Sequence, residues 1–304
     1  MSKMLKPQFP DYHNLFVSKN DIHLSILTYG CCLIRSAFNP RSIKKLASEI
    51  QFISTEKSNK VKCGELTETF SRFHITETEY QSFYPEKSLY DILKKKKWND
   101  TIKAIFGTNQ YYQHQETYTR GIDVRPEEER DLTSFRPLQF HLDTIYHPPV
   151  DKFSIIFWIP FDDCGTTRPG IQLVPINHHV IRRIINFDSD TGFNHTEPNI
   201  DESQWSMKNV WQRIVTTIPN EIVWRPKFSI GDLLIMSSWV PHASYTTREM
   251  NLPRRSVELR YHGNELNPLP ITDGTPNKIK LFLHQFAAKI RRQNYVYIHA
   301  VDQK

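Results

Sequence analysis

The fold class is decided by the stretch Phe153-Ser154-Ile155-Ile156-Phe157-Trp158-Ile159. Isoleucine and aromatic residues dominate this stretch, and these residue types favour a β-strand. The run ends at Pro160, which lacks the N–H that pairing within a sheet needs, and at the polar pair Asp162-Asp163. We therefore expect residues 153–159 to form a central strand of a β-sheet.

The chain from residue 109 to residue 262 has the pattern of an all-β unit, because short apolar or alternating runs are separated by proline and glycine. Further strands are predicted at 110–119, 171–174, 228–236 and 256–261. Residues 186–226 interrupt this pattern with many Asp, Asn and Ser residues and with one predicted helix near 205–214. An insertion of this length is suited to act as a lid or as a wall of a substrate pocket.

Helices are expected to flank the β unit. The first follows a strand at 29–35 and begins near Asn39-Pro40, and its apolar face is formed by Ile43, Leu46, Ala47 and Ile50. Residues 54–85 are polar and irregular in pattern, and two helices are predicted around 89–93 and 98–106. A C-terminal helix is expected to cover the β unit with Leu281, Phe282, Phe286, Ala287 and Ile290.

We expect a single domain over residues 1–304. Within it, 1–108 supplies a strand and helices that pack on the β unit, 109–262 is the β core, and 263–304 is a helical extension. The overall class is therefore mainly β with flanking α-helices.

The composition is typical of a globular protein, with 38% hydrophobic and 24% charged residues. The net charge of +6 is spread along the chain except at Lys94-Lys95-Lys96-Lys97, and no stacking-aromatic motif accompanies that run. We interpret the run as a solvated helix end and expect no nucleic-acid partner. The four cysteines lack zinc or disulfide spacing, and neither a secretory leader nor an 18-residue apolar run occurs. We expect a cytoplasmic monomer or homodimer without a membrane partner.

A metal site is predicted by His141-Leu142-Asp143 together with the later His242. Residues two apart in a strand or tight turn point the same way, so His141 and Asp143 can bind one ion. Two imidazoles and one carboxylate suit iron(II), and they leave coordination positions open for a chelating co-substrate and O2. The alternative is a chance H-x-D in a chain with 13 histidines, which would then be structural or hold another metal. The downstream order of a Gly231-Asp232 turn, an apolar strand and His242 favours the metal site.

The basic pair Arg254-Arg255 lies in a predicted strand, so only one of the two side chains can face the metal. The alternate positions differ in character: Arg254, Ser256, Glu258 and Arg260 are polar, whereas Arg255, Val257, Leu259 and Tyr261 are mostly apolar. A polar set suits a wet interior, and an apolar set suits packing under helices. We therefore predict that Arg254 faces the metal, where its guanidinium can bind a carboxylate through two hydrogen bonds. Glu258 and Arg260 either pair structurally or offer charges to a polar substrate.

With these residues in place, the chain resembles the phytanoyl-CoA dioxygenase family of Fe(II)- and 2-oxoglutarate-dependent oxygenases, from about Tyr29 to His262. The best-matching stretches are Gln139 to Asp143, Trp158 with Pro169 to His178, Gly231 to Ile235, His242 to Ser244, and Arg254 to Val257. Pro175-Ile176-Asn177-His178 departs from the proline-glycine-serine-histidine that is common in the family.

The resemblance implies a double-stranded β-helix, which is a jelly roll related to cupins. It implies that His141, Asp143 and His242 bind Fe(II) and that Arg254 binds the distal carboxylate of 2-oxoglutarate. Further contacts to 2-oxoglutarate are predicted from Ser244, Trp158, Ser256 and Gln113. Alternatively, Trp158 is a core residue and Ser244 caps a turn.

The activity that the resemblance implies is hydroxylation of a small-molecule substrate, with O2 consumed and succinate and CO2 released. Desaturation and cyclisation use the same centre. Relatives that halogenate have a small residue where this chain has Asp143, so halogenation is not expected. A non-catalytic cupin-like binding protein is the alternative from another class.

Overall fold

The computed structural model describes residues 11–13, 18–65, 75–89, 96–107, 111–113, 118–122, 141–143, 153–176, 181, 187–188, 192–193, 223–247 and 249–263. The chain divides into two compact units, Met1–Asn267 and Pro268–Lys304, and all described residues lie in the first. The predicted helix near 205–214, the predicted C-terminal helix and most of the insertion 186–226 lie outside the described residues.

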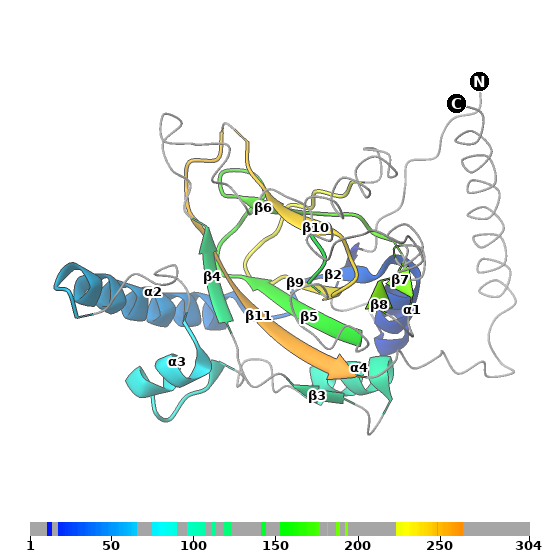
Figure 1. Cartoon of the computed structure of the whole chain (residues 1–304), viewed down its shortest axis with the longest axis horizontal. Helices are drawn as coiled ribbons and strands as arrows, with labels where there is room; N and C mark the ends of the chain where they lie inside the picture. Colours follow the sequence, from blue (N-terminus) through cyan, green and yellow to red (C-terminus); the bar gives the residue numbers. More distant parts are fainter. Residues whose placement is uncertain are drawn as a thin grey trace, which may run out of the picture. The chain divides into compact units, whose positions relative to one another are not determined.

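The larger layer is a seven-stranded sheet, shown in Figure 1. Its strand order is β1 (Asp11–His13), β2 (Cys31–Arg35), β9 (Leu233–Ser237), β5 (Phe153–Pro160), β11 (Arg254–Gly263) and β3 (Tyr111–Gln113), with β4 (Tyr118–Ile122) also paired to β11. The β1–β2 pair is parallel, and the other pairs described in this sheet are antiparallel. Every residue of β5 is buried between its two neighbours, as expected for a central strand.

The smaller layer contains the antiparallel pair β6 (Gly170–Leu173) and β10 (His242–Tyr245), which Figure 1 shows apart from the larger sheet. Single bridges extend this pair on both sides, from His242 to His141 and from Leu173 to Trp224. One apolar cluster joins the two layers, and it includes Ile156, Trp158, Leu234, Met236, Ile171 and Leu173. Two facing, mainly antiparallel layers around a shared interior form the jelly roll that the resemblance implies. A separate hairpin pairs β7 (Phe187–Asp188) with β8 (Gly192–Phe193).

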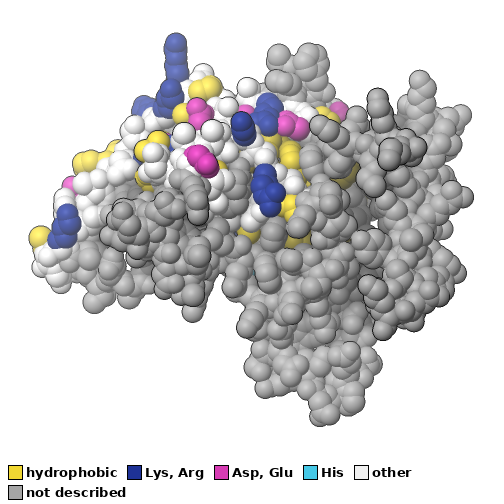
Figure 2. Space-filling model, turned by 90° about the horizontal axis from the view of Figure 1, so that it is seen from above, with side chains coloured by type: hydrophobic (Ala, Val, Ile, Leu, Met, Phe, Trp, Pro, Cys, Tyr) yellow, Lys and Arg dark blue, Asp and Glu magenta, His cyan; other side chains and the backbone are white. Residues whose placement is uncertain are grey.

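Helices pack on the opposite face of the larger sheet. A second apolar cluster combines that face with α1 (Lys19–Tyr29), α2 (Pro40–Lys62) and α4 (Lys96–Phe106). The predicted apolar face of α2 is confirmed, since Ile43, Leu46, Ala47 and Ile50 are all buried. Among the described helices, none is both long enough and apolar enough to cross a membrane. On the face in Figure 2, basic and acidic side chains of the described residues are interspersed.

Two local predictions are corrected. The strand predicted at 29–35 begins only at Cys31, because a capping box between Ser18 and Asp21 starts α1, and this helix includes Tyr29. The region 54–85 is not irregular throughout: α2 continues to Lys62, and α3 (Glu77–Phe83) begins at a second capping box, formed by Thr76 and Glu79. Of the strand predicted at 110–119, the structure describes β3 and the first residues of β4, and both pair with β11; residues 114–117 lie outside the described ranges.

Candidate metal centre

His141 and His242 are brought together by their own backbones. The His141 N–H donates to the His242 carbonyl at 3.0 Å, and the His242 N–H donates to the His141 carbonyl at 3.1 Å. Residues paired directly across an antiparallel bridge have neighbouring side chains on the same face. The two imidazole ring centroids are accordingly 4.3 Å apart. Two positions far apart in sequence thus supply two of the three predicted ligands.

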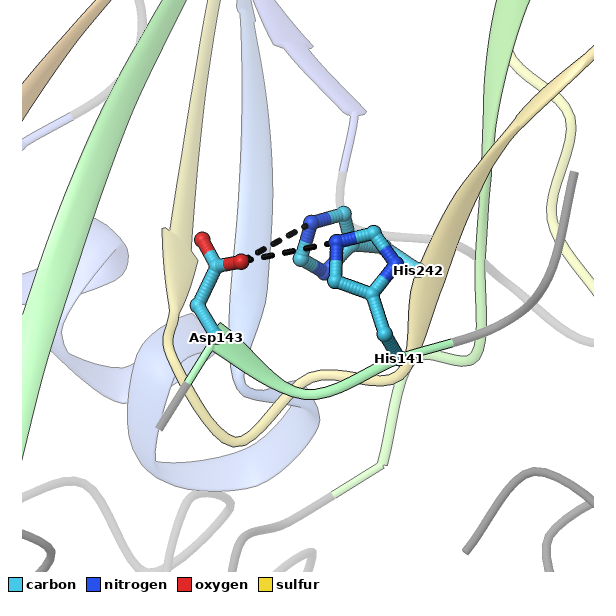
Figure 3. Close-up of side chains that lie close together, drawn as sticks. All are labelled: His141, Asp143 and His242. Carbon is cyan, nitrogen blue, oxygen red and sulfur yellow. Dashed lines mark ion pairs between the residues drawn. The ribbon is translucent and has the colours of Figure 1, made fainter. Parts of the chain in front are cut away.

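Asp143 completes this set (Figure 3). Its Oδ1 lies 3.5 Å from His141 Nε2 and 3.8 Å from His242 Nε2. Leu142, between the first two ligands, is fully buried in the helix-side core, so it points away from the site. The three donor atoms all lie within 4.8 Å of one another. The structure therefore brings together the three predicted metal ligands.

The protonation of His242 is suited to metal binding. Its Nδ1 lies 3.0 Å from the Val240 carbonyl, and a carbonyl only accepts, so Nδ1 carries the proton and Nε2 keeps its lone pair. Burial, followed by the neighbouring His141, lowers the pKa of His242 to about 4. The imidazole is therefore neutral at pH 7, with the nitrogen that faces Asp143 available to an ion.

Asp143 is ionised although it is buried. Burial raises its pKa, but the neighbouring His242, Arg260 and His141 together lower the pKa well below the usual range. The Arg260 Nη2 atom donates to Asp143 Oδ2 at 3.0 Å and to Glu258 Oε2 at 3.3 Å. A neutral imidazole nitrogen beside an anionic carboxylate is a donor set that fits a divalent transition metal such as iron(II).

One face of strand β11 lines the interior with polar and charged side chains. Its alternate residues Arg254, Ser256, Glu258, Arg260 and His262 are all buried, and each is at most 8% exposed. The intervening Val257, Leu259 and Tyr261 belong to the core under the helices. Arg255, on that same outer face, donates to Asp162 at 2.8 and 3.1 Å and to Gln51 of α2 at 2.9 Å. The two faces of the strand thus differ as the alternation predicts.

Arg254, Ser244 and Trp158 form a second cluster beside the ligand set. The guanidinium of Arg254 donates to the Gly170 carbonyl at 2.7 Å and to Ser244 Oγ at 3.0 Å. Its central carbon lies 5.4 Å from the centroid of the Trp158 ring, within the range of a cation–π contact. A fixed cation is therefore held by β10, β6 and β5 in the interior that also contains the metal ligands.

The other two predicted co-substrate residues are placed differently. Ser256 is fully buried, and its hydroxyl has no hydrogen-bond partner within the described ranges. Gln113 is paired with Tyr261, seven positions along β11 from Arg254, which is about 23 Å at roughly 3.3 Å per residue. The structure does not bring Gln113 to the Arg254 cluster, and the side chain of Gln113 is outside the described part.

Sequence reasoning did not identify the contact between Arg260 and Asp143. Strand alternation correctly placed Arg260 on the same face of β11 as Arg254. The contact also depends on where residues 141–143 lie relative to β11, and no local sequence pattern specifies that position. Nothing in the sequence indicated that the Gly170 carbonyl accepts a hydrogen bond from Arg254.

Comparison with known families gave one match over most of the chain. The sequence profile of the family described as phytanoyl-CoA dioxygenase (PhyH) matches residues 26–256. This range contains the three predicted ligands, Arg254 and Ser256. Among curated proteins, no sequence match was found.

Comparison with solved structures gave matches at low sequence identity. Apo ThoJ, a non-heme monooxygenase, has a TM-score of 0.51 and 12% identity over 81% of this chain and 79% of its own. AviO1 from Streptomyces viridochromogenes Tue57 has a TM-score of 0.48 and 14% identity over 83% and 98%. EvdO2 from Micromonospora carbonacea var. aurantiaca, complexed with 2-oxoglutarate, has a TM-score of 0.45 and 10% identity over 86% and 96%.

Proposed function

Because the chain belongs to the phytanoyl-CoA dioxygenase family of Fe(II)- and 2-oxoglutarate-dependent oxygenases, we propose that its reaction is the hydroxylation of a small-molecule substrate. One observation carries the proposal for this chain. Its donor atoms from His141, Asp143 and His242 lie within 4.8 Å of one another, in an interior that also holds the buried guanidinium of Arg254.

We assign the metal ligands to Nε2 of His141, Oδ1 of Asp143 and Nε2 of His242. The bridge between the two histidine backbones and the Nδ1 bond to Val240 hold the imidazoles in position before any ion binds. Three protein ligands leave positions open on an octahedral ion, as binding of a bidentate co-substrate and O2 requires.

Arg254 is assigned to the distal carboxylate of 2-oxoglutarate. A guanidinium suits this role because it presents parallel donors to a carboxylate and keeps its charge when buried. Gly170 and Ser244 hold the side chain in place, and Ser244 and Ser256 offer hydroxyls to the same carboxylate. Trp158 supports the guanidinium from one side and excludes water.

Iron(II) with 2-oxoglutarate and O2 supplies the oxidising chemistry, while the protein orients the reactants and keeps water away. Asp143 occupies a position that a halide would need, so hydroxylation is proposed over halogenation. Desaturation and cyclisation remain alternatives because they differ only in how the substrate is placed. A binding protein without catalysis is the alternative from another class.

The test is an anaerobic titration of purified protein with Fe(II) and then with 2-oxoglutarate. A bidentate 2-oxoglutarate on Fe(II) produces a visible metal-to-ligand charge-transfer band, and we expect this band only when protein, metal and co-substrate are all present. A matched titration of His242→Ala should show no band. If the wild-type protein also shows none, the oxygenase proposal fails.

Admission of O2 then separates the reaction types. Hydroxylation adds one oxygen atom to the substrate for each succinate formed, whereas desaturation or cyclisation removes two hydrogen atoms and adds no oxygen. Mass spectrometry of products from a panel of small molecules reads out this difference. A chelate band without succinate formation would support the binding protein.

A further inference from the structure

We propose that Arg260 is a positioning residue that makes Asp143 bind the metal through Oδ1 alone. This inference rests on the proposed function, because it concerns how one of the assigned ligands is presented. It goes beyond the ligand set itself, since Arg260 touches neither the histidines nor the Arg254 cluster among the contacts described.

The two carboxylate oxygens of Asp143 have different partners. Oδ1 faces both imidazoles, at 3.5 and 3.8 Å from their Nε2 atoms. Oδ2 accepts a hydrogen bond from Arg260 Nη2 at 3.0 Å. An ion placed between the three donors would therefore meet Oδ1, while Oδ2 is already occupied by a charged donor. This division prevents the carboxylate from rotating to bind the ion with both oxygens.

Arg260 is itself held by Glu258, two positions earlier on the same face of β11. The same Nη2 atom lies 3.3 Å from Glu258 Oε2, so its two hydrogens can serve one carboxylate each. The side chains of Arg260, Asp143 and Glu258 are 3%, 6% and 10% exposed. In this buried setting, a charge-assisted hydrogen bond is strong and has a defined direction.

The trio orients Asp143 without cancelling its charge. Arg260 alone would neutralise the carboxylate and weaken its attraction for a cation. Glu258 restores the balance, because one positive and two negative groups leave the trio with the single negative charge of an isolated aspartate. The metal site thus keeps an anionic ligand and gains a fixed ligand geometry.

The first experiment titrates metal-free protein with Co(II), which reports affinity and coordination number through its visible d–d absorption. In Arg260→Gln the carboxylate of Asp143 is no longer held in one orientation, and the loss of this supporting hydrogen bond should raise the Co(II) dissociation constant about 10- to 100-fold in spite of the more negative site. The d–d absorption should also weaken, because the freed carboxylate can then bind through both oxygens and increase the coordination number. Arg255→Gln is the matched control: it removes an arginine from the same strand that pairs with Asp162 on the other face, and both readouts should stay unchanged.

A folded Arg260→Gln variant with wild-type affinity and spectrum would overturn the role of Arg260 and leave the proposed function intact. A wild-type protein that binds no Co(II) would overturn both. If Arg260→Gln does not fold, a crystal structure of the wild-type protein with Ni(II) decides the matter. We expect only Oδ1 at about 2.1 Å from the metal, with Oδ2 still on Arg260; ligation by both oxygens would overturn the inference.

Discussion

Arg254 and Arg255 are adjacent in sequence but have opposite environments. Arg254 is 5% exposed and lies over Trp158, whereas Arg255 reaches outward to Asp162 and to Gln51 of α2. Truncating one partner of a buried, hydrogen-bonded charge pair costs about 2 to 5 kcal/mol of binding free energy. We therefore expect Arg254→Ala to raise the 2-oxoglutarate dissociation constant ~30-fold or more, measured by the charge-transfer band.

Arg255→Ala is the comparison for this prediction. It removes a side chain of equal size from the next position of β11, so it should leave 2-oxoglutarate affinity near the wild-type value. Weak binding in the Arg255 variant, beside normal binding in the Arg254 variant, would reverse the assignment of the two arginines.

His242 makes the stability of the metal-free protein depend on pH. Its pKa is lowered from 6.5 to about 4, first by burial and then by His141. Between these two values the unfolded chain binds a proton that the folded chain does not bind, so the free energy of unfolding falls as the pH falls. We expect the effect of His242 to be absent above pH 6.5 and complete below pH 4. Denaturant titrations of metal-free protein across this window should show it.

His242→Asn isolates the contribution of His242 from that of other titrating groups. The asparagine amide can still donate to the Val240 carbonyl but does not titrate. Its stability should therefore change less with pH in the same window. An identical slope in the two proteins would show that His242 is not the group responsible.

At the scale of elements, the turn that leads into β9 depends on Gly231. Its φ is 96°, and a Cβ built there would lie 2.6 Å from the carbonyl oxygen of Phe38, a backbone atom that cannot easily move. Gly64 is the natural control, because its φ is 75° but a Cβ would meet nothing within 4 Å. We expect Gly64→Ala to lower the free energy of unfolding by about 1 to 2 kcal/mol, through backbone strain alone.

Gly231→Ala carries the same strain and a steric clash, so we expect a loss of about 2 to 5 kcal/mol. Chemical denaturation of the two variants measures both values. Equal losses would mean that the approach of Phe38 to this turn is looser than the structure indicates.

The sequence was most informative about elements whose signal is local. The apolar run in β5, the alternation along β11 and the amphipathic face of α2 each reflect burial by immediate neighbours, and their existence was predicted. The capping boxes at Ser18 and Thr76 were equally local, but no helix was predicted from them. The register of β3 and β4 depends on pairing with β11, a strand more than 130 residues away, which no local pattern specifies.

In the candidate site, too, contacts between segments that are distant in sequence could not be predicted. Residue types and spacing were enough to select His141, Asp143, His242 and Arg254 as candidates. The bond from Arg260 to Asp143 needs the register of two segments that are 117 residues apart, so it became visible only in three dimensions.

At the scale of the whole molecule, the cysteines report on how tightly the first compact unit is packed. Cys31, Cys32 and Cys164 are buried and Cys63 is exposed, and these are the four cysteines of the sequence. Burial raises the pKa of Cys31 and Cys32 well above the usual range and that of Cys164 to about 12. We expect a thiol reagent at neutral pH to modify one cysteine in the native protein and four after denaturation.

Cys63→Ser provides the control, since the native variant should not react quickly at all. Rapid modification of a second cysteine in the native wild-type protein would show that one of the two apolar clusters opens readily. Peptide mapping of the modified protein would then identify which cluster contains the modified cysteine.

The backbone bridge between His141 and His242 also closes a loop of chain. All residues from 142 to 241, including β5, β6 and β9, lie between two positions that are hydrogen-bonded to each other. The closure free energy of such a loop changes slowly with length, by about 0.6 kcal/mol for each doubling. Residues 194–222, which lie between the β7–β8 hairpin and Trp224 in sequence, can therefore be lengthened or shortened at little thermodynamic cost while both histidines stay hydrogen-bonded to each other. Insertions or deletions within this loop can therefore change substrate preference while the two histidines that close the loop stay paired.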